Sequence, residues 1–323
     1  MADSNEAVNI YSLPNELLVQ ILTPFTTRSL LPLTSVSHRF HAIILRILHY
    51  RLLLAASLQE YKLILECFHP SSRLTDPHSF CTYLGTPGLS NNYEGKGSLY
   101  ENCKTAEKLS RLSSVYSRFR PDHITTDQES RSNNVFQPPT GTNGVSENSL
   151  TGAHHDVVEA NSHISNEIRF FKKQISLDEF ESFSQLCTMV NLVKVANNST
   201  RLLSALNVEE GVIRIYKDWL REQSKRDHIN TDDSNLPDDD EGILWVDTAK
   251  NVGLKVRVKE RRWNREAPIL IHRDEELATT YEVEIEEIRI RTTRLLLTVE
   301  QSLAEQQNYF KAIIIGPVHS AAI

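Results

Sequence analysis

Two cysteines and two histidines in the first third of the chain have the residue types of a structural zinc site. They form the motif Cys67-x-His69 followed by His78-x-x-Cys81, and two Cys with two His are a common tetrahedral ligand set. The first pair, however, is separated by a single residue, and two prolines inside the segment already explain a rigid loop. We therefore interpret the segment as structural and predict no metal site.

A row of basic residues near position 257 alternates with apolar residues, so the charges would share one face of a strand. Such a row could bind an acidic ligand or a phosphopeptide. The candidate substrate-binding residues are Lys255, Arg257 and Lys259. The favoured alternative is that three glutamates, which alternate in the same way between residues 282 and 286, lie on a neighbouring strand. Cross-strand pairing would then use most of the basic charge.

The sequence carries none of the catalytic or phosphate-binding motifs that would indicate an enzyme. It has no P-loop, no Gly-x-Ser-x-Gly elbow and no His-Glu-x-x-His pair, and Gly95-Lys96-Gly97 lacks the third glycine of a dinucleotide-binding turn. His154-His155-Asp156 and His163 fall in a polar stretch, where we expect them to be solvated. We therefore predict a protein that is not an enzyme, with no catalytic residue and no cofactor.

Composition and charge exclude several classes of partner. The chain has 323 residues, 40% of them hydrophobic, and a formal net charge of -7. It can therefore build a packed core, but it lacks the basic surface that nucleic-acid binding needs. Its four cysteines are widely spaced and no signal-peptide pattern precedes them, which is typical of the cytosol or nucleus. The most apolar stretch, residues 42–58, is interrupted by Arg46, His49 and Arg51, so no membrane span is predicted.

The elements that must position these residues change in character along the chain. Residues 13–68 have apolar side chains at steps of three and four, which predicts several short helices followed by a longer one. Between about residues 85 and 165 the composition shifts to Ser, Asn, Thr, Gly and Pro. Such a stretch buries little apolar surface, so we predict a flexible linker or insertion.

The C-terminal part begins with two helical patterns. A capping box, Ser176-x-x-Glu179, predicts a helix that continues to about Val193. A second amphipathic helix is predicted from Asn207 to about Trp219, with acidic residues in its first turn. The acidic run at residues 232–241 is interpreted as a solvated loop.

After Gly242 the apolar period changes from the helical value to two, which predicts strands. The predicted strands are residues 243–246, 254–259, 269–271 and 281–298. Within the last of them the apolar residues move from odd to even positions, so we predict a β-bulge near Glu286-Glu287. Residues 299–307 have helical composition, and residues 312–315 are predicted as a final strand.

Residues 12–48 contain three short signatures in a fixed order. They read Ser-Leu-Pro-Asn-Glu-Leu-Leu-Val-Gln-Ile-Leu from Ser12, Arg-Ser-Leu-Leu from Arg28, and Val-Ser-His-Arg-Phe from Val36. This order resembles the F-box, over about the first sixth of the chain, and the rest resembles the variable remainder of filamentous-fungal F-box proteins. Two features depart from the family pattern. Pro24 and Pro32 would shorten or kink the first two helices, and Thr26-Thr27 replaces the usual acidic residue and proline.

The resemblance implies binding to the Skp-type adaptor of a cullin-based ubiquitin ligase, and through it to the cullin and RING subunits. The implied adaptor-binding residues are Leu13, Pro14, Leu17, Leu18, Ile21, Leu30, Leu33, Val36 and Phe40. Independently, roughly forty residues with this much apolar surface lie below the size at which a domain stabilises itself, so part of the surface should face a partner or the rest of the chain. The alternative is that the segment is only the helical start of a larger core.

We expect a multidomain chain. The predicted parts are an all-α F-box at residues 9–50, a helical extension at 51–84, a flexible linker or insertion at 85–170 and an α+β domain with a mainly antiparallel sheet at 171–323. The resemblance implies a substrate-recognition subunit that works in the cytoplasm or nucleus and recruits an unidentified target through the α+β domain. The alternatives are an F-box scaffold or regulatory protein without a role in ubiquitination, or a C-terminal domain that binds a small ligand.

Overall fold

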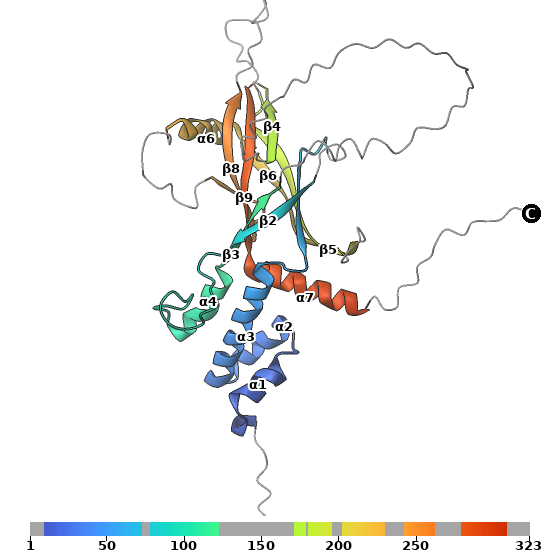
Figure 1. Ribbon diagram of the computed structural model, residues 1–323. Coiled ribbons are helices and arrows are strands. Elements are labelled where there is room, and N and C mark those ends of the chain that lie inside the picture. Colours follow the sequence, from blue (N-terminus) through green and yellow to red (C-terminus); the bar gives the residue numbers. More distant parts are fainter. Residues whose placement is uncertain are drawn as a thin grey trace, which may run out of the picture.

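A computed structural model of the chain has two packed parts, a helical N-terminal part and an antiparallel sheet that rolls into a nearly closed barrel (Figure 1). The structure describes residues 10–72, 78–122, 171–178, 180–195, 202–229, 242–261 and 279–308. Both the helical N-terminus and the antiparallel sheet were predicted, and both are confirmed. None of the helices in these ranges has both the length and the apolarity needed to cross a membrane.

Four short helical segments and one long helix form the N-terminal part, as the apolar spacing predicted. They are η1 (Ile10–Ser12), α1 (Asn15–Leu22), α2 (Thr27–Leu30), η2 (Leu31–Ser35) and α3 (His38–Ala56). Hydroxyl groups cap two of them, since Thr26 accepts from the Ser29 amide and Ser37 accepts from the Phe40 amide. Pro32 lies at the start of η2, where a helix has no use for its missing N–H.

The helical extension predicted for residues 51–84 is wrong beyond Ala56. The chain there forms a hairpin of β1 (Lys62–Phe68) and β2 (Ser79–Gly85). Leu63, Leu65 and Cys67 are buried at every second position of β1, so the period is that of a strand. The leucine-rich composition of this segment favoured a helix. Burial against the neighbouring strands instead stabilises a strand.

A short helix and a strand occupy part of the predicted linker, so that prediction is wrong for these residues. The elements are η3 (Thr105–Glu107), α4 (Lys108–Ser113) and β3 (Tyr116–Pro121). Leu112 and Phe119 are buried and tie the segment to the two cores, although its surroundings are polar in composition. Residues 123–170, with His154, His155, Asp156 and His163, lie outside the described residues.

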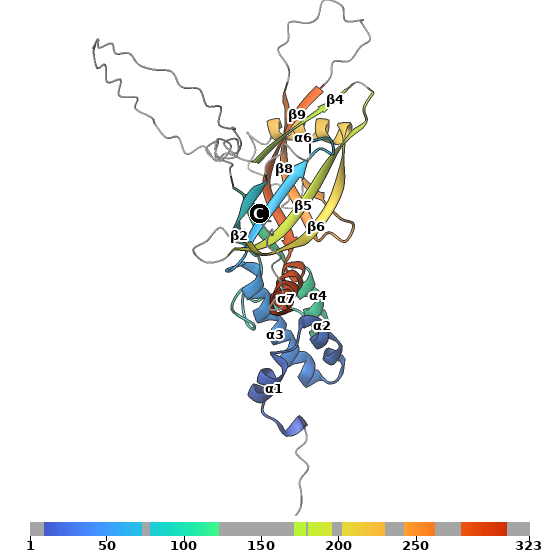
Figure 2. The same cartoon turned by 90° about the vertical axis from the view of Figure 1, so that its right-hand side faces the viewer.

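Within the described residues, nine strands make up one sheet in which all pairs are antiparallel (Figure 2). The strands not yet named are β4 (Phe171–Leu177), β5 (Phe183–Val195), β6 (Leu202–Tyr216), β7 (Ile243–Trp245), β8 (Val252–Arg261) and β9 (Thr279–Arg291). Their order is β6-β5-β1-β2-β3-β9-β8-β7, and β4 also pairs with β9. β3 and β4 take different halves of β9, so they follow one another along its side.

Two helices predicted in the C-terminal part are strands. β5 and most of β6 occupy the residues predicted as helical after Ser176 and after Asn207. Leu186, Val190 and Leu192 are all buried, and the partly buried residues of β5 alternate with them. Leu186, Val190 and Val193 also fit the helical steps of four and three, and pairing of β5 between β1 and β6 selects the strand. The helix predicted to Trp219 begins only at α6 (Lys217–Ile229).

The predicted β-bulge in β9 is confirmed, because Glu286 is the one residue of β9 skipped in its register with β8. The strand predicted to run to residue 298 ends at Arg291, where α7 (Thr292–Asn308) begins. The helix predicted at residues 299–307 is therefore confirmed and is longer than expected. Three predicted segments lie outside the described residues. They are the strands at residues 269–271 and 312–315 and the acidic run at residues 232–241.

The two ends of the sheet approach each other at Gly211 of β6. A Cβ atom there would lie 2.6 Å from the carbonyl oxygen of Val246, just after β7. Asn251, before β8, donates to Glu209 of β6. Because only glycine allows this approach, Gly211 is where the barrel comes closest to closing.

The final helix joins the barrel to the helical part. α7 lies between the strands and helices α1 to α3 in both views (Figures 1 and 2), and it packs against α3, β6 and β9. One apolar core fills the barrel, and a second lies among α1, α2, α3 and α4. Since α7 contributes to both, the two parts form one packed body.

Candidate functional site

Exposed apolar side chains gather on the first helices of the chain. Leu17 and Ile21 lie four residues apart on α1, hence on one face, and they are 43% and 48% exposed. Val36, after η2, is 53% exposed. Burying such a side chain is worth about 1.5–3 kcal/mol. Several of them on one small domain are suited to a protein partner.

The nine residues implied for adaptor binding fall into two sets in the structure. Pro14, Leu17, Ile21 and Val36 are exposed, and Leu13 and Leu33 are half-buried. The buried residues are Leu18, Leu30 and Phe40. These three pack inside the helical core, so in this conformation they support the exposed set from behind.

Three further exposed apolar residues lie on or between the same short helices and were not among the nine. They are Ile10, Phe25 and Leu31, each between 40% and 47% exposed. Phe25 could have been included, because it follows Leu17 and Ile21 at the same step of four residues. Ile10 precedes the first signature, so no motif marked it.

The start of α1 is held by Arg39 of α3. Its guanidinium donates to the carbonyl oxygen of Leu13, and its Nε donates to Asn15 Oδ1 at 2.8 Å. Leu13 and Pro14 are therefore fixed against α3, so that α1 presents Leu17 and Ile21 in one orientation. Arg39, which lies in the third signature, thus has a structural role in this chain.

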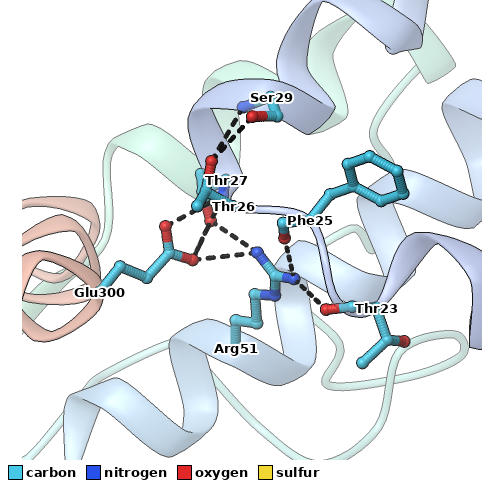
Figure 3. Close-up of polar contacts among 7 residues, drawn as sticks. All are labelled: Thr23, Phe25, Thr26, Thr27, Ser29, Arg51 and Glu300. Atoms are coloured by element: carbon cyan, nitrogen blue, oxygen red, sulfur yellow. Dashed lines mark hydrogen bonds and ion pairs between the residues drawn. The ribbon is translucent and has the colours of Figure 1, made fainter. Parts of the chain in front are cut away.

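The loop between α1 and α2 is held by Arg51 of α3 (Figure 3). Arg51 Nη2 donates to the carbonyl oxygens of Thr23 at 2.8 Å and Phe25 at 2.6 Å. Its Nη1 lies 2.9 Å from Glu300 Oε1 of α7 and donates to Thr27 Oγ1 at 3.1 Å. A guanidinium offers five donors in a planar fork. Arg51 uses those of Nη1 and Nη2 to link α3 to the α1–α2 loop, to α2 and to α7.

Glu300 completes the same network from the C-terminal end of the chain. Its carboxylate accepts from the Thr27 amide at 2.9 Å and from Thr27 Oγ1 at 2.6 Å. Thr27 is the first residue of α2 and is buried, so its amide has no partner within the helix. The charge of Glu300 also balances that of Arg51, and both side chains are less than one-fifth exposed.

The basic row lies opposite the acidic row, as the favoured alternative predicted. Lys255, Arg257 and Lys259 pair in register with glutamates of β9. Arg257 forms an ion pair with Glu286, and Lys259 lies 3.0 Å from Glu284. These ion pairs neutralise basic charge that would otherwise be available to bind a ligand.

Glu284 is the most enclosed member of the charged rows, with its side chain 1% exposed. It lies 2.8 Å from Lys172 Nζ of β4 and 3.0 Å from Lys259 Nζ of β8. Burial by itself would raise the pKa of Glu284, but hydrogen bonds from the two lysines outweigh burial and lower the pKa. The ion pairs therefore stabilise the join between three strands.

The Cys and His residues that match a zinc ligand set in sequence have other surroundings. Cys67 is buried in the barrel core, 3.8 Å from Thr188 Oγ1, and His69 Nδ1 lies 2.7 Å from Ser71 Oγ. His78 packs edge-on against Phe80. Among the residues that the structure describes, no three potential ligands come close enough together to hold a metal ion.

A comparison with known protein families bears on the exposed apolar side chains of the first helices. Residues 10–55 match the family of F-box-like domains, so the chain contains an F-box-like domain that spans η1 to α3. No curated protein and no solved structure matches the chain. An F-box-like domain implies binding to a Skp-type adaptor and is typical of substrate adaptors of SCF ubiquitin ligases. F-box proteins are typically non-catalytic subunits of these ligases.

Proposed function

We propose that this chain is a substrate receptor of an SCF-type ubiquitin ligase. Its F-box-like helices bind the Skp-type adaptor, and its barrel binds a target protein. The chain supplies proximity alone, because holding a target beside the charged conjugating enzyme raises the effective concentration of the two reactants. The observation that carries the proposal is the set of exposed apolar side chains on the F-box-like domain.

The adaptor-binding residues of this proposal are the exposed and half-buried members of the predicted set. They are Leu13, Pro14, Leu17, Ile21, Leu33 and Val36, with Leu18, Leu30 and Phe40 as their support. Apolar burial at such a cluster can hold a partner without charge pairing. Leu17 and Ile21 stand at its centre, because their exposed side chains share one face of α1.

The barrel is the proposed target-binding part because α7 attaches it firmly to the F-box-like domain. A receptor must hold its target at a defined distance from the adaptor, and packed helices transmit position better than a flexible linker does. Lys255, Arg257 and Lys259 remain weak candidates for target contact, since their charges already meet glutamates of β9. Much of the barrel interior is filled by apolar side chains, so a target is expected on the outside of the barrel.

Capture from cells tests the proposal. The full chain and its Leu17→Asp/Ile21→Asp variant are each expressed with an affinity tag, and Leu303→Asp, with a leucine 44% exposed on α7, is the matched control. The wild type and the control are expected to capture the adaptor with cullin, whereas the double variant loses both. A target should be captured by all three and should accumulate only where the double variant replaces the wild type.

Two outcomes would lead to different conclusions. Equal capture of the adaptor by the double variant and the control would contradict adaptor binding through this face. Normal capture of the adaptor, with no captured protein changing in abundance, would favour the alternative of an F-box scaffold or regulatory protein.

A further inference from the structure

The loop between α1 and α2 is fixed by two residues that lie outside it, Arg51 of α3 and Glu300 of α7. Thr23 and Phe25 offer their carbonyl oxygens to Arg51, and the Thr27 amide donates to Glu300. Glu300 is 273 residues from Thr27 in the sequence and lies beyond the F-box-like match at residues 10–55. A carboxylate from the C-terminal helix therefore determines the shape of a loop in the F-box-like domain.

Phe25 is the exposed apolar residue in this loop. Its backbone is held on both sides, since its amide bonds to Leu22 O at 3.2 Å and its carbonyl oxygen accepts from Arg51 at 2.6 Å. Its side chain is 47% exposed, and Figure 3 shows the ring pointing away from Arg51 and Glu300. The network thus fixes the backbone of Phe25 and leaves the ring available.

Phe25 also continues the exposed face of α1. Leu17, Ile21 and Phe25 follow one another at steps of four residues, and Thr23, just after α1, still has right-handed helical backbone angles. A step of four keeps side chains on nearly one face of a helix. A partner that covers Leu17 and Ile21 would therefore meet the Phe25 ring next.

We propose that Phe25 is a further contact for the Skp-type adaptor, and that Arg51 and Glu300 are positioning residues that hold its backbone for binding. The inference rests on the proposed function, because it names an additional part of the same surface. A loop held in its bound shape before binding loses less conformational freedom when the partner arrives. Adaptor affinity then depends on a residue of α7 that does not contact the adaptor.

The network also explains how the chain tolerates Thr26-Thr27 at this position. Thr26 caps α2 through its hydroxyl group, which accepts from the Ser29 amide. Glu300 supplies the negative charge at the start of α2, where a carboxylate is favourable.

Titration of the full-length chain with purified Skp-type adaptor tests the inference. The variants are Phe25→Ala, Glu300→Gln and the two combined, and Glu305→Gln is the matched control. Glu305 lies on the same helix and accepts a hydrogen bond from Gln301, which a glutamine side chain can also accept. Glu300→Gln keeps the size of the side chain but removes the charge that balances Arg51.

Phe25→Ala and Glu300→Gln are each expected to weaken adaptor binding about tenfold, with Glu305→Gln unchanged. The combined variant should bind no more weakly than Phe25→Ala alone, because Glu300 acts through Phe25 and coupled residues are not additive. A general loss of structure would not produce this dependence on Phe25. In the same samples, hydrogen exchange of the Thr27 amide should accelerate in Glu300→Gln while amides of the barrel strands keep the wild-type rate.

The outcomes separate this inference from the proposed function. If the wild type does not bind the adaptor, the proposed function fails. If the wild type binds but Phe25→Ala or Glu300→Gln binds equally well, or if the two effects are additive, the inference fails and the proposed function stands. If Glu300→Gln also accelerates exchange throughout the barrel, Glu300 is a general structural residue and the positioning role is wrong.

Discussion

Leu295 and Leu296 are neighbours in α7, yet they lie in different apolar cores. Leu295 is buried in the barrel core and Leu296 in the core of the helical part. Successive helical residues point about 100° apart, so a helix between two bodies can place adjacent side chains in each. α7 is therefore shared structure, and the F-box-like domain and the barrel should unfold together.

Leu295→Ala and Leu296→Ala should each lower the stability of the whole chain. Both side chains are 5% exposed or less, and truncating a buried leucine to alanine costs about 2–5 kcal/mol. Thermal unfolding followed by circular dichroism should show one transition, shifted to lower temperature in both variants. Leu303→Ala, at an exposed position of the same helix, should leave the midpoint nearly unchanged. Separate transitions for helical and strand signals, with each variant shifting only one, would contradict the shared role of α7.

Glu284→Gln should make the chain less stable at neutral pH and reduce its sensitivity to acid. The lowered pKa of Glu284 means that its stabilising effect is present above the unfolded-state pKa and is lost as the pH falls through the folded-state pKa. The loss at neutral pH should be about 1–3 kcal/mol, less than for a fully buried pair because Lys172 and Lys259 reach water.

Urea unfolding at several pH values measures this effect. The stability of the wild type should fall more steeply than that of the variant between about pH 5 and pH 3. Parallel curves for the two proteins would show that Glu284 is not held in its charged form by the lysines.

Gly211→Ala should destabilise the barrel at its point of closest approach. The added Cβ would lie 2.6 Å from the carbonyl oxygen of Val246, and the backbone cannot move aside without separating β6 from the end of β7. Overpacking of this kind costs about 1–3 kcal/mol. Val212→Ala, at the next and exposed position of β6, is the matched control and should change the free energy of unfolding by less than about 0.5 kcal/mol. Equal stability of the two variants would mean that the sheet is open at Gly211.

Local patterns predicted the helical N-terminus. They also predicted those strands whose apolar residues alternate with a period of two and fit no helical spacing. Leu17, Ile21 and the signatures around them identified the helices, and the change from odd to even positions located the bulge at Glu286. The opposite charges of Arg257 and Glu286 predicted that β8 and β9 face each other. In each case the signal lay within a short segment of the sequence, or in two rows of charged residues with the same spacing of two.

Long-range pairing explains what the sequence patterns missed. β5 was predicted as a helix because Leu186, Val190 and Val193 also fit a helical spacing, and only its pairing with β1 and β6 selects the strand. The contact between Arg51 and Glu300 joins residues 249 apart in the chain, and neither residue belongs to a motif. The sequence patterns also did not show which residues of the F-box-like domain are buried. Leu17 and Leu18 are both leucines, but only Leu18 is buried.

The adaptor affinity of the full-length chain tests the central claim most directly. Isothermal titration of the wild type with purified Skp-type adaptor should show one-to-one binding. Leu17→Asp/Ile21→Asp should weaken the Kd by at least about 100-fold, because two apolar contacts of about 1.5–3 kcal/mol each are replaced by charges. Leu303→Asp should bind like the wild type. Wild-type affinity in the double variant, or no binding by the wild type, would contradict the claim that this face of α1 binds the adaptor.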